Sequence, residues 1–197
     1  MDISKIIERD PNLFLNDLES NMIEIKAKVN SSSFLVIGGA GSIGQAVTKE
    51  IFSLNPKKLH IIDINENELV ELVRDIRSSL GYIVGDFATF CMDASEMNLK
   101  RLFEDNGGYD FVLNLSALKH VRSEKDKFSL ERMIEVNIFN TVSAYEISKE
   151  FNSSNYFCVS TDKAANPVNL MGCSKRIMEI YLNNAFDSKT FSSARFA

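Results

Sequence analysis

From residue 33 onward, six short apolar runs alternate with longer segments that have helical periodicity. A short apolar run is typical of a buried strand, and apolar residues three and four apart are typical of a helix that packs on a sheet. We expect strands at 34–37, 59–62, 88–92, 111–115, 156–160 and 191–196. We expect helices at 43–54, 66–79, 96–106, 128–151 and 171–186. Alternating strands and helices, with strands apolar on both faces, predict an α/β fold with a doubly wound parallel sheet.

Residues 1–32 have a different pattern. Their apolar residues recur at near-helical spacing and are interrupted at Asp10 and Pro11, which predicts short helices that pack on a larger body. We therefore expect an N-terminal helical segment over 1–32 and a sheet-containing domain over 33–197. The sequence stops at "FSSARFA", a predicted strand without a polar tail. This predicts the first part of a longer protein, with the region that binds substrate after it.

Composition argues against several classes of function. The formal net charge is −5 and the pI is near 5.2, whereas a protein that binds nucleic acid needs a clustered basic face. No apolar run approaches the roughly 18 residues of a membrane span, and the start "MDISKIIERD" does not resemble a signal peptide. We expect no nucleic-acid partner, no membrane span in this chain and a cytoplasmic location.

The three cysteines predict reduced thiols. Cys91, Cys158 and Cys173 are an odd number and contain no C-x-x-C pair. Only His60 and His120 could join them as metal ligands, and the spacing fits no zinc pattern. We expect no metal site.

A glycine-rich stretch follows the first predicted strand. In "FLVIGGAGSIGQAV", Gly38, Gly41 and Gly44 stand three apart and open a predicted helix. The first glycine allows a tight turn, the second lets backbone N–H groups approach a pyrophosphate, and the third lets helix and strand pack closely. The helix N-terminus, with Ser42 and Ile43, then faces negative charge. This pattern predicts a dinucleotide site in a Rossmann fold.

Polar residues follow other predicted strands at the same edge of the sheet. Asp63 stands 19 residues after Gly44, where an acid can accept hydrogen bonds from the adenosine ribose hydroxyls; an ordinary turn aspartate is the alternative. No arginine follows Asp63 closely, which favours NAD over NADP. Two further pairs are either cofactor contacts or plain turns: Asp93 with Ala94, and Ser116 with Ala117.

Thr161, Asp162 and Lys163 follow the fifth predicted strand, again at this edge. Met171 and Lys175 are one helical turn apart in the next helix and therefore point at one place. In isolation these residues could be surface charges. The predicted cofactor over this edge favours a catalytic group instead.

At these residues the chain resembles the extended short-chain dehydrogenase/reductase superfamily. It is more closely similar to the bacterial polysaccharide-biosynthesis (CapD-like) group of UDP-N-acetylglucosamine 4,6-dehydratases. The matching segments are "GGAGSIG" (38–44), "SALKHV" (116–121), "EVNIFNT" (135–141), "STDKAANPVNLMGCSKR" (160–176) and "RDPNLFLNDLE" (9–19).

The resemblance implies a three-stage reaction on UDP-N-acetylglucosamine. The sugar is oxidised at C4, one water is lost across C5 and C6, and hydride returns to C6. Lys163 would take the C5 proton, Asp162, kept protonated, would protonate the departing C6 hydroxyl, and Thr161 would bond the C4 oxygen. Lys175 would hold the nicotinamide ribose and assist deprotonation at C4.

Other roles follow from the resemblance. Lys119 would lie near the substrate phosphates or sugar, and Asn137 matches the helix asparagine of the superfamily, at the cofactor. His120 is a participant or a packed neighbour. Asn169 faces substrate or serves the turn after Pro167. Homo-oligomers are expected, because relatives commonly associate.

Met171 stands where the wider superfamily has tyrosine, and a thioether cannot carry a proton. Some members of the resembled group, including ones that retain the C5 configuration, also have methionine here. Our hypothesis is that Asp162, or a water held by Thr161 and Lys175, accepts the C4 hydroxyl proton. The rival functions are a UDP-sugar 4-epimerase on the same fold and a non-catalytic NAD-binding sensor.

Overall fold

The computed structural model describes residues 13–119, 124–185 and 191–196. His120 and residues 9–12 of the "RDPNLFLNDLE" segment therefore lie outside the described residues. The elements are α2 (Leu13–Ser31), β1 (Ser33–Ile37), α3 (Ser42–Ser53), β2 (Lys58–Asp63), α4 (Glu66–Ser79), β3 (Asp86–Cys91), α5 (Glu96–Asn106), β4 (Phe111–Asn114), α6 (Lys127–Ile134), the π-helix η2 (Glu135–Phe139), α7 (Asn140–Glu150), β5 (Asn155–Thr161), the 3-10 helix η3 (Asp162–Ala164), α8 (Leu170–Asn184) and β6 (Phe191–Phe196).

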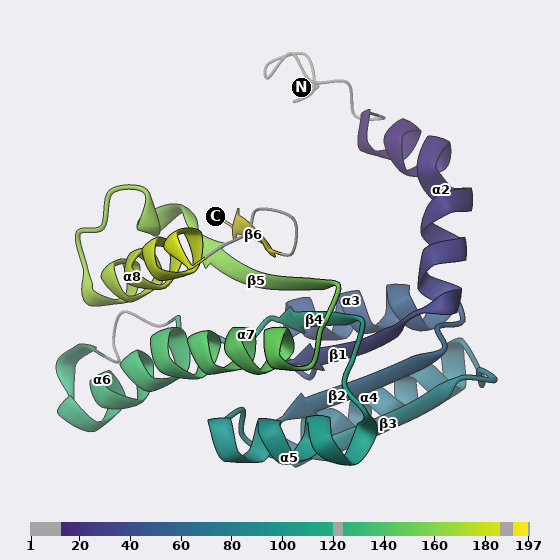
Figure 1. The fold of residues 1–197 in the computed structure, drawn as a ribbon, viewed down its shortest axis with the longest axis horizontal. Coiled ribbons are helices and arrows are strands. Elements are labelled where there is room, and N and C mark those ends of the chain that lie inside the picture. The colour runs from purple at the N-terminus through teal and green to yellow at the C-terminus, as the bar shows by residue number, and fades with distance from the viewer. Residues whose placement is uncertain (1–12, 120–123, 186–190, 197) are drawn as a thin grey trace.

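The six strands form one parallel sheet in the order β3-β2-β1-β4-β5-β6 (Figure 1). The predicted doubly wound parallel sheet is confirmed. The strand order reverses between β1 and β4, so the connections that leave these two strands diverge at their carboxyl ends. Ligands bind in that crevice in folds of this kind.

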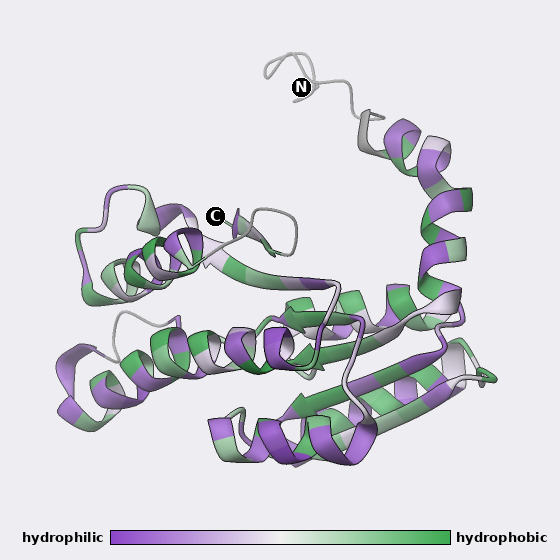
Figure 2. Cartoon of the chain, in the orientation of Figure 1, coloured by the Kyte–Doolittle hydropathy of each residue, from purple (hydrophilic) through white to green (hydrophobic). Residues whose placement is uncertain are grey.

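Successive residues of β1 enter two different cores. Leu35 and Ile37 pack with the helices α5, α7 and α8 on one face. Phe34 and Val36 pack with α3 and α4 on the other. Figure 2 shows the central strands as almost continuously hydrophobic, while the helices are mixed. Burial on both faces is the reason that these strands have no polar alternation.

Local signals set several helix boundaries. The side chain of Asn65 accepts a hydrogen bond from Glu68 N and caps α4, and the Asp126 carboxylate accepts from Phe128 N and Ser129 N and caps α6. Gly107 ends α5 in the left-handed conformation. These signals explain why the predicted helices at 66–79 and 96–106 agree with α4 and α5.

Most other predicted bounds differ from the observed ones by one or two residues, and two of the differences have an identifiable cause. The expected strand 88–92 begins earlier, as β3, because the polar Asp86 at its start pairs with Lys58 of β2. The expected single helix 128–151 consists of α6, η2 and α7. At this π-turn Thr141 Oγ1 donates a hydrogen bond to the Val136 carbonyl, five residues earlier.

The expected N-terminal helical segment is confirmed over Leu13–Ser31, but as a single helix, α2, where short helices packed on the body were expected. It is one helix of 19 residues that extends away from the sheet (Figure 1). Leu18 and Ile23 are exposed, and only its last turns, with Ile25 and Val29, reach the core.

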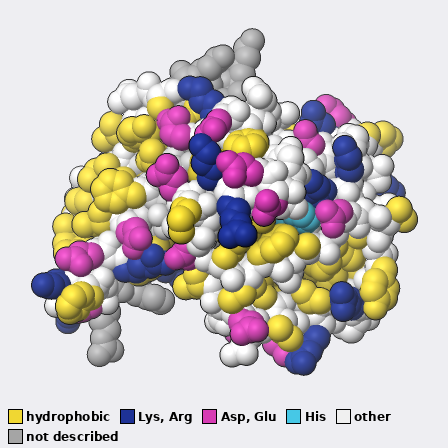
Figure 3. Space-filling view, turned by 60° about the horizontal axis from the view of Figure 1, so that its bottom comes forward, with side chains coloured by type: hydrophobic (Ala, Val, Ile, Leu, Met, Phe, Trp, Pro, Cys, Tyr) yellow, Lys and Arg dark blue, Asp and Glu magenta, His cyan; other side chains and the backbone are white. Residues whose placement is uncertain are grey.

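Acidic and basic side chains are interspersed over the face drawn in Figure 3. In the part of the chain that the structure describes, no helix has the length and apolar character needed to cross a membrane.

Candidate active site at the carboxyl edge of the sheet

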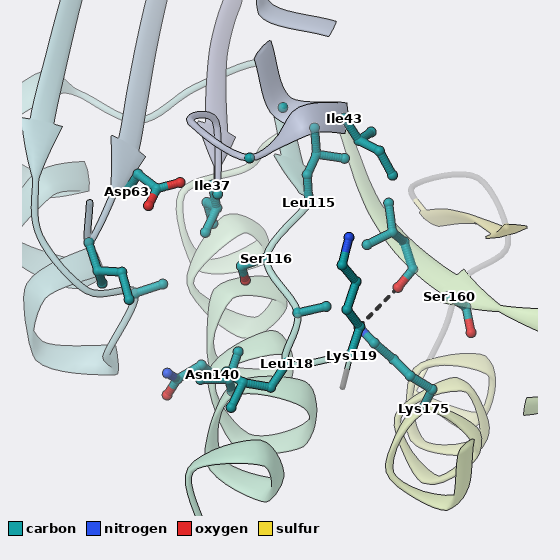
Figure 4. Close-up of a pocket in the computed structure, with 18 of the residues that line it drawn as sticks. Ile37, Ile43, Asp63, Leu115, Ser116, Leu118, Lys119, Asn140, Ser160 and Lys175 are labelled. Atoms are coloured by element: carbon teal, nitrogen blue, oxygen red, sulfur yellow. Dashed lines mark hydrogen bonds between the residues drawn. The ribbon is translucent and has the colours of Figure 1, made fainter. Parts of the chain in front are cut away.

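A cavity of about 490 Å³ lies at the carboxyl ends of the strands, where the sheet order reverses (Figure 4). Its wall comes from the glycine-rich loop, the ends of β2 and β5, the loop after β4, and the helices α6, η2, α7 and α8. The sequence-predicted residues on this wall are Gly38, Gly41, Ser42, Ile43, Gly44, Asp63, Ala94, Ser116, Ala117, Lys119, Thr161, Lys163, Met171 and Lys175.

The three glycines of the loop have different surroundings. Gly38 has φ +75° and a Cβ there would lie 2.7 Å from Ser116 N, while a Cβ on Gly44 would lie 2.2 Å from the Gly38 oxygen. Both positions therefore require glycine for the fold itself. A Cβ on Gly41 would meet only the Gly38 oxygen, at 3.5 Å. Gly41 is also the N-cap of α3 and has no side chain to cover the helix N–H groups that face the cavity.

Asp63, at the end of β2, binds the backbone of this loop. Its Oδ2 accepts a hydrogen bond from Ala40 N at 3.0 Å, and its Oδ1 accepts one from Asn65 N at 3.0 Å. The aspartate thus serves its own turn and also faces the cavity. A second hollow of about 430 Å³ continues beyond it, with Gln45 and Glu68 on its wall.

Asp93 and Ala94 are neighbours in the sequence but have different surroundings in the structure. The Asp93 carboxylate accepts hydrogen bonds from Ser95 N at 3.1 Å and Asn98 Nδ2 at 2.9 Å, and the hydrogen bonds with Ser95 lower its pKa. It belongs to the turn before α5 and does not line the cavity, whereas Ala94 does. Of the two sequence readings of Asp93, cofactor contact or plain turn, its geometry matches the turn.

Asn137 lies behind the cavity wall and is fully buried. Its Oδ1 accepts from Leu118 N at 3.0 Å, and its Nδ2 donates to Leu118 O at 2.9 Å and Ser174 Oγ at 3.1 Å. The side chain therefore ties the loop after β4 to α8. Asn137 was expected at the cofactor, but its side chain supports the cavity wall from behind.

Arg132, Val136 and Asn140 line the cavity and were missed by sequence reasoning. The signal lay in "EVNIFNT", where Asn140 stands three residues after Asn137 in an apolar helical segment. Arg132 gave no signal, because a glutamate three residues later is typical of an ordinary ion pair on a helix surface. The two side chains do form such a pair, at 2.8 Å.

Asp162 and Lys163 form an ion pair at the mouth of the cavity. Asp162 Oδ1 lies 3.1 Å from Lys163 Nζ and also accepts hydrogen bonds from Lys163 N at 2.8 Å and Thr161 Oγ1 at 2.9 Å. The bonds from Lys163 and Thr161 lower the pKa of the Asp162 carboxyl. The carboxyl is therefore ionised here, which differs from the protonated acid expected from the sequence. Thr161 and Lys163 line the cavity, and Asp162 stands beside it.

Lys175 and Met171 are both buried, 3% and 4% exposed. Lys175 Nζ donates a hydrogen bond to the Val159 carbonyl at 3.1 Å, drawn dashed in Figure 4. Burial lowers the pKa of Lys175 to about 8. Met171 lies one turn earlier on the same helix face, and its backbone N donates to Glu124 Oε1 at 2.9 Å. Both side chains line the same cavity.

Asn169 caps α8, because its Oδ1 accepts a hydrogen bond from Gly172 N at 2.8 Å. It does not line the cavity. This geometry matches the turn role that was the alternative to substrate contact.

The charge on the cavity wall opposes that of the whole chain. Among the residues that the structure describes, four basic side chains line it, Lys119, Arg132, Lys163 and Lys175, and Asp63 is the only acid. Figure 4 shows Lys119 rising from the loop after β4 into the cavity. A wall with this balance, in a chain of net charge −5, favours anionic ligands.

Within residues 13–119, 124–185 and 191–196, no group of three or more His, Cys, Asp or Glu side chains is placed to hold a metal ion. The cysteines Cys91, Cys158 and Cys173 are free thiols.

Comparison with known proteins gives relatives of the same kind. An uncharacterized membrane protein of Methanocaldococcus jannaschii is 34% identical over 75% of this chain and 41% of its own length. The capsular polysaccharide biosynthesis protein CapD of Staphylococcus aureus is 27% identical over 100% of this chain and 32% of its own. An inverting UDP-N-acetylglucosamine 4,6-dehydratase of Campylobacter jejuni is 29% identical over 74% of this chain and 41% of its own. The chain thus spans less than half the length of these relatives.

Solved structures share the fold. Pen from Bacillus thuringiensis aligns with a TM-score of 0.73 at 21% identity, over 85% of this chain and 51% of that one. The UDP-glucose 4-epimerase from Stenotrophomonas maltophila, solved with NAD and formylated UDP-arabinopyranose, aligns with a TM-score of 0.68 at 19% identity, over 83% and 52%.

A family model described as "polysaccharide biosynthesis protein" matches residues 34–197, which include the sheet apart from Ser33 and every segment of the cavity wall. With this sheet, this glycine-rich loop and this match, the chain belongs to that polysaccharide biosynthesis protein family.

Proposed function

We propose that the chain is the cofactor-binding part of a nucleotide-sugar 4,6-dehydratase. The enzyme, a lyase, would convert UDP-N-acetylglucosamine to a UDP-4-keto-6-deoxy-N-acetylhexosamine for surface polysaccharide or glycan biosynthesis. The observation that carries the proposal is the Asp162–Lys163 ion pair, beside a cavity that also holds the buried Lys175. Elimination of water needs both a base and an acid next to the sugar, and this pair supplies both.

The residues of the cavity fit a dinucleotide. Gly41 leaves the start of α3 open to a pyrophosphate, Asp63 offers carboxylate oxygens for ribose hydroxyls, and Lys119 supplies a cation between them and β5. The second hollow next to Asp63 carries Glu68, and two carboxylates would repel a 2′-phosphate. We therefore propose NAD rather than NADP.

The basic wall also fits a second diphosphate. A nucleotide sugar and a dinucleotide each carry a diphosphate. The four basic side chains on the wall, Lys119, Arg132, Lys163 and Lys175, supply enough positive charge for two such groups, which is more than one diphosphate would need. A UDP-sugar is consistent with this wall. The similar proteins named above include one whose name states this substrate class.

The ionised Asp162 supplies the proton acceptor that Met171 cannot be. A nicotinamide bound in this cavity would supply the hydride acceptor for C4 of the sugar and the hydride donor for C6. Asp162, held ionised by Thr161 and Lys163, takes the C4 hydroxyl proton in the first stage. Lys175, buried at the Val159 carbonyl, holds the ribose and places positive charge beside the developing C4 oxygen.

The same pair then performs the elimination. Lys163 takes the C5 proton as the free amine, after its ammonium proton has passed to solvent, from which it is regained at the end of the cycle. Asp162 delivers its proton to the departing C6 hydroxyl, which leaves as water. The C5 proton returns from Lys163 when C6 is reduced, so protons and electrons balance over the cycle.

The test is incubation of the full-length protein with UDP-N-acetylglucosamine in deuterated water. We expect a product that has lost one water and carries deuterium at C5, by mass spectrometry and NMR. A product isobaric with the substrate would instead identify a UDP-sugar 4-epimerase, the second candidate. Several similar proteins are epimerases, but return of hydride to C4 needs no base at C5. Absence of any cofactor reduction with any UDP-sugar would contradict both and favour a binding protein.

A further inference from the structure

A buried carboxylate lies directly behind the catalytic strand end. Glu179, on α8, is 4% exposed, and Ser160 of β5 donates a hydrogen bond to its Oε1 at 2.6 Å. Ser160 immediately precedes Thr161 and lines the cavity. The carboxylate is thus one side chain away from the cavity wall.

Two arginines hold the same carboxylate. Arg195 of β6 donates from Nε to Oε1 at 2.8 Å and from Nη2 to Oε2 at 2.6 Å, and Arg176 Nη1 lies 3.4 Å from Oε2. The hydrogen bonds from Arg195 lower the pKa of Glu179 to about 2. Glu179 is therefore ionised throughout the range in which enzymes work, and it joins β5, α8 and β6.

Glu179 also stands one helical turn after Lys175, on the same face of α8. Figure 4 shows Ser160 and Lys175 on the same side of the cavity. Surface ion pairs are usually replaceable. Here the glutamate is buried beside the site, while its two arginine partners are partly exposed.

The ammonium of Lys175 has few charged neighbours among the described residues. From β5 it meets the Cys158 thiol and the Val159 carbonyl, and from its own helix the Glu179 carboxylate. Lys119 and Lys163 reach the same cavity from the loop after β4 and from η3. Burial disfavours the Lys175 charge, whereas the negative charge of Glu179 favours it. Burial raises the pKa of Cys158 to about 12, so this residue is a neutral thiol where Lys175 titrates.

We propose that Glu179 is a positioning residue for the reaction. Through Ser160 it fixes the end of β5 that carries Thr161, and through its negative charge it stabilises the Lys175 ammonium. Arg195 and Arg176 partly neutralise Glu179 and so set how much of its charge Lys175 experiences. The catalytic consequence rests on the proposed function, while the electrostatic coupling does not.

The test uses two changes of opposite sign. Glu179→Gln removes the carboxylate charge and keeps the shape, so Lys175 should lose its proton about one pH unit lower. Arg176→Met removes a half-exposed positive charge from Glu179 without touching the strand β6. It should move the Lys175 titration upward by a few tenths of a pH unit, and Arg195→Met should move it further in the same direction.

The measurement is the Cε NMR signal of Lys175 in isotope-labelled full-length protein, assigned with Lys175→Met and followed against pH. Glu150→Gln is the matched control, because it removes a carboxylate from an exposed pair with Lys100 and should leave the titration unchanged. The pH profile of cofactor reduction should shift with the same signs.

Shifts in one direction in both the glutamate and arginine variants, or no shift in either, would overturn the proposal and leave Glu179 a structural anchor. This result is readable even if the protein acts on no UDP-sugar. If the Lys175 signal shifts as expected but no turnover occurs, the coupling stands and the proposed function fails. If Glu179→Gln does not fold, the Arg176→Met titration decides by itself.

Discussion

Lys163 Nζ lies 3.1 Å from Oδ1 of Asp162, its neighbour in the sequence, and that same oxygen accepts hydrogen bonds from Lys163 N and Thr161 Oγ1. One carboxylate oxygen thus accepts from three donor atoms of its two sequence neighbours, Thr161 and Lys163. The arrangement keeps Asp162 ionised at the start of a reaction and lets it become an acid once it has accepted a proton.

Asp162→Asn should abolish oxidation at C4, whereas Met171→Ala should retain it. The amide cannot accept the C4 hydroxyl proton, and loss of a general base typically lowers the rate by about 10²- to 10⁴-fold. Stopped-flow absorbance of the bound nicotinamide measures this step directly. The reverse outcome, with Met171→Ala inactive and Asp162→Asn active, would sink the assignment.

Lys163→Met should separate oxidation from elimination. The C4 step does not use the Lys163 amine, so bound cofactor should still be reduced, while exchange of the C5 proton should fall by at least about 100-fold. Mass spectrometry of substrate recovered from deuterated water checks this. Exchange at the wild-type rate would show that another group removes the C5 proton.

Lys175→Met should inactivate the enzyme and stabilise the fold at neutral pH. Burial lowers the pKa of Lys175 from 10.5 to about 8, so its charge costs about 3 kcal/mol wherever both native and unfolded states are protonated, below pH 8. The lost hydrogen bond to Val159 O offsets about 1 kcal/mol of the gain.

The sign of the pH dependence follows from the lowered pKa. Between about pH 8 and 10.4 the unfolded chain binds more protons at Lys175 than the native one, so wild-type stability rises relative to the variant. Urea unfolding of both proteins at pH 7 and above pH 10 tests this. A difference that stays constant with pH would contradict the buried charge.

Gly41→Ala and Gly44→Ala should have opposite consequences. A Cβ at Gly41 has room at 3.5 Å, so the free energy of unfolding should change by less than about 0.5 kcal/mol, while NAD affinity falls by about tenfold or more. A Cβ at Gly44 would lie 2.2 Å from the Gly38 oxygen and should destabilise the fold by about 2 kcal/mol or more. Urea unfolding and cofactor titration separate the two effects, and unchanged NAD affinity in Gly41→Ala would place the cofactor elsewhere.

Glu68→Arg should raise affinity for NADP relative to NAD by about tenfold. The change replaces a carboxylate with a cation in the hollow beside Asp63, where a 2′-phosphate would lie. Glu71→Arg is the control, since Glu71 lies on the same helix in an exposed pair with Arg74. Calorimetric titrations with both dinucleotides measure the ratio, and an equal change in both variants would mean that only net charge matters.

The glycine-rich loop, the acid at Asp63 and the pair Met171 and Lys175 could be read from the sequence. Each depends on a local rule: a strand followed by a tight turn, a strand end, and the spacing of one helical turn. The agreement of α4 and α5 with the predicted ranges has the same cause, because caps such as Asn65 and Gly107 act within a few residues. These relationships hold whatever the rest of the chain does.

Other features depend on contacts between distant segments. Asn137 was predicted at the cofactor, yet its side chain ties Leu118 to Ser174, 19 and 37 residues away. Asp162 was predicted protonated, but only the positions of its donors reveal that it is ionised. Glu179 gave no signal, because its partners Ser160 and Arg195 come from two different strands.

The sequence by itself determined the order of strands and helices and which residues reach the carboxyl edge of the sheet, because hydrophobic periodicity and turn chemistry are local. Only the tertiary structure decided which of those residues face the cavity, which support it from behind and which carry charge. Those properties depend on burial and on hydrogen-bond partners that folding brings together from far along the chain.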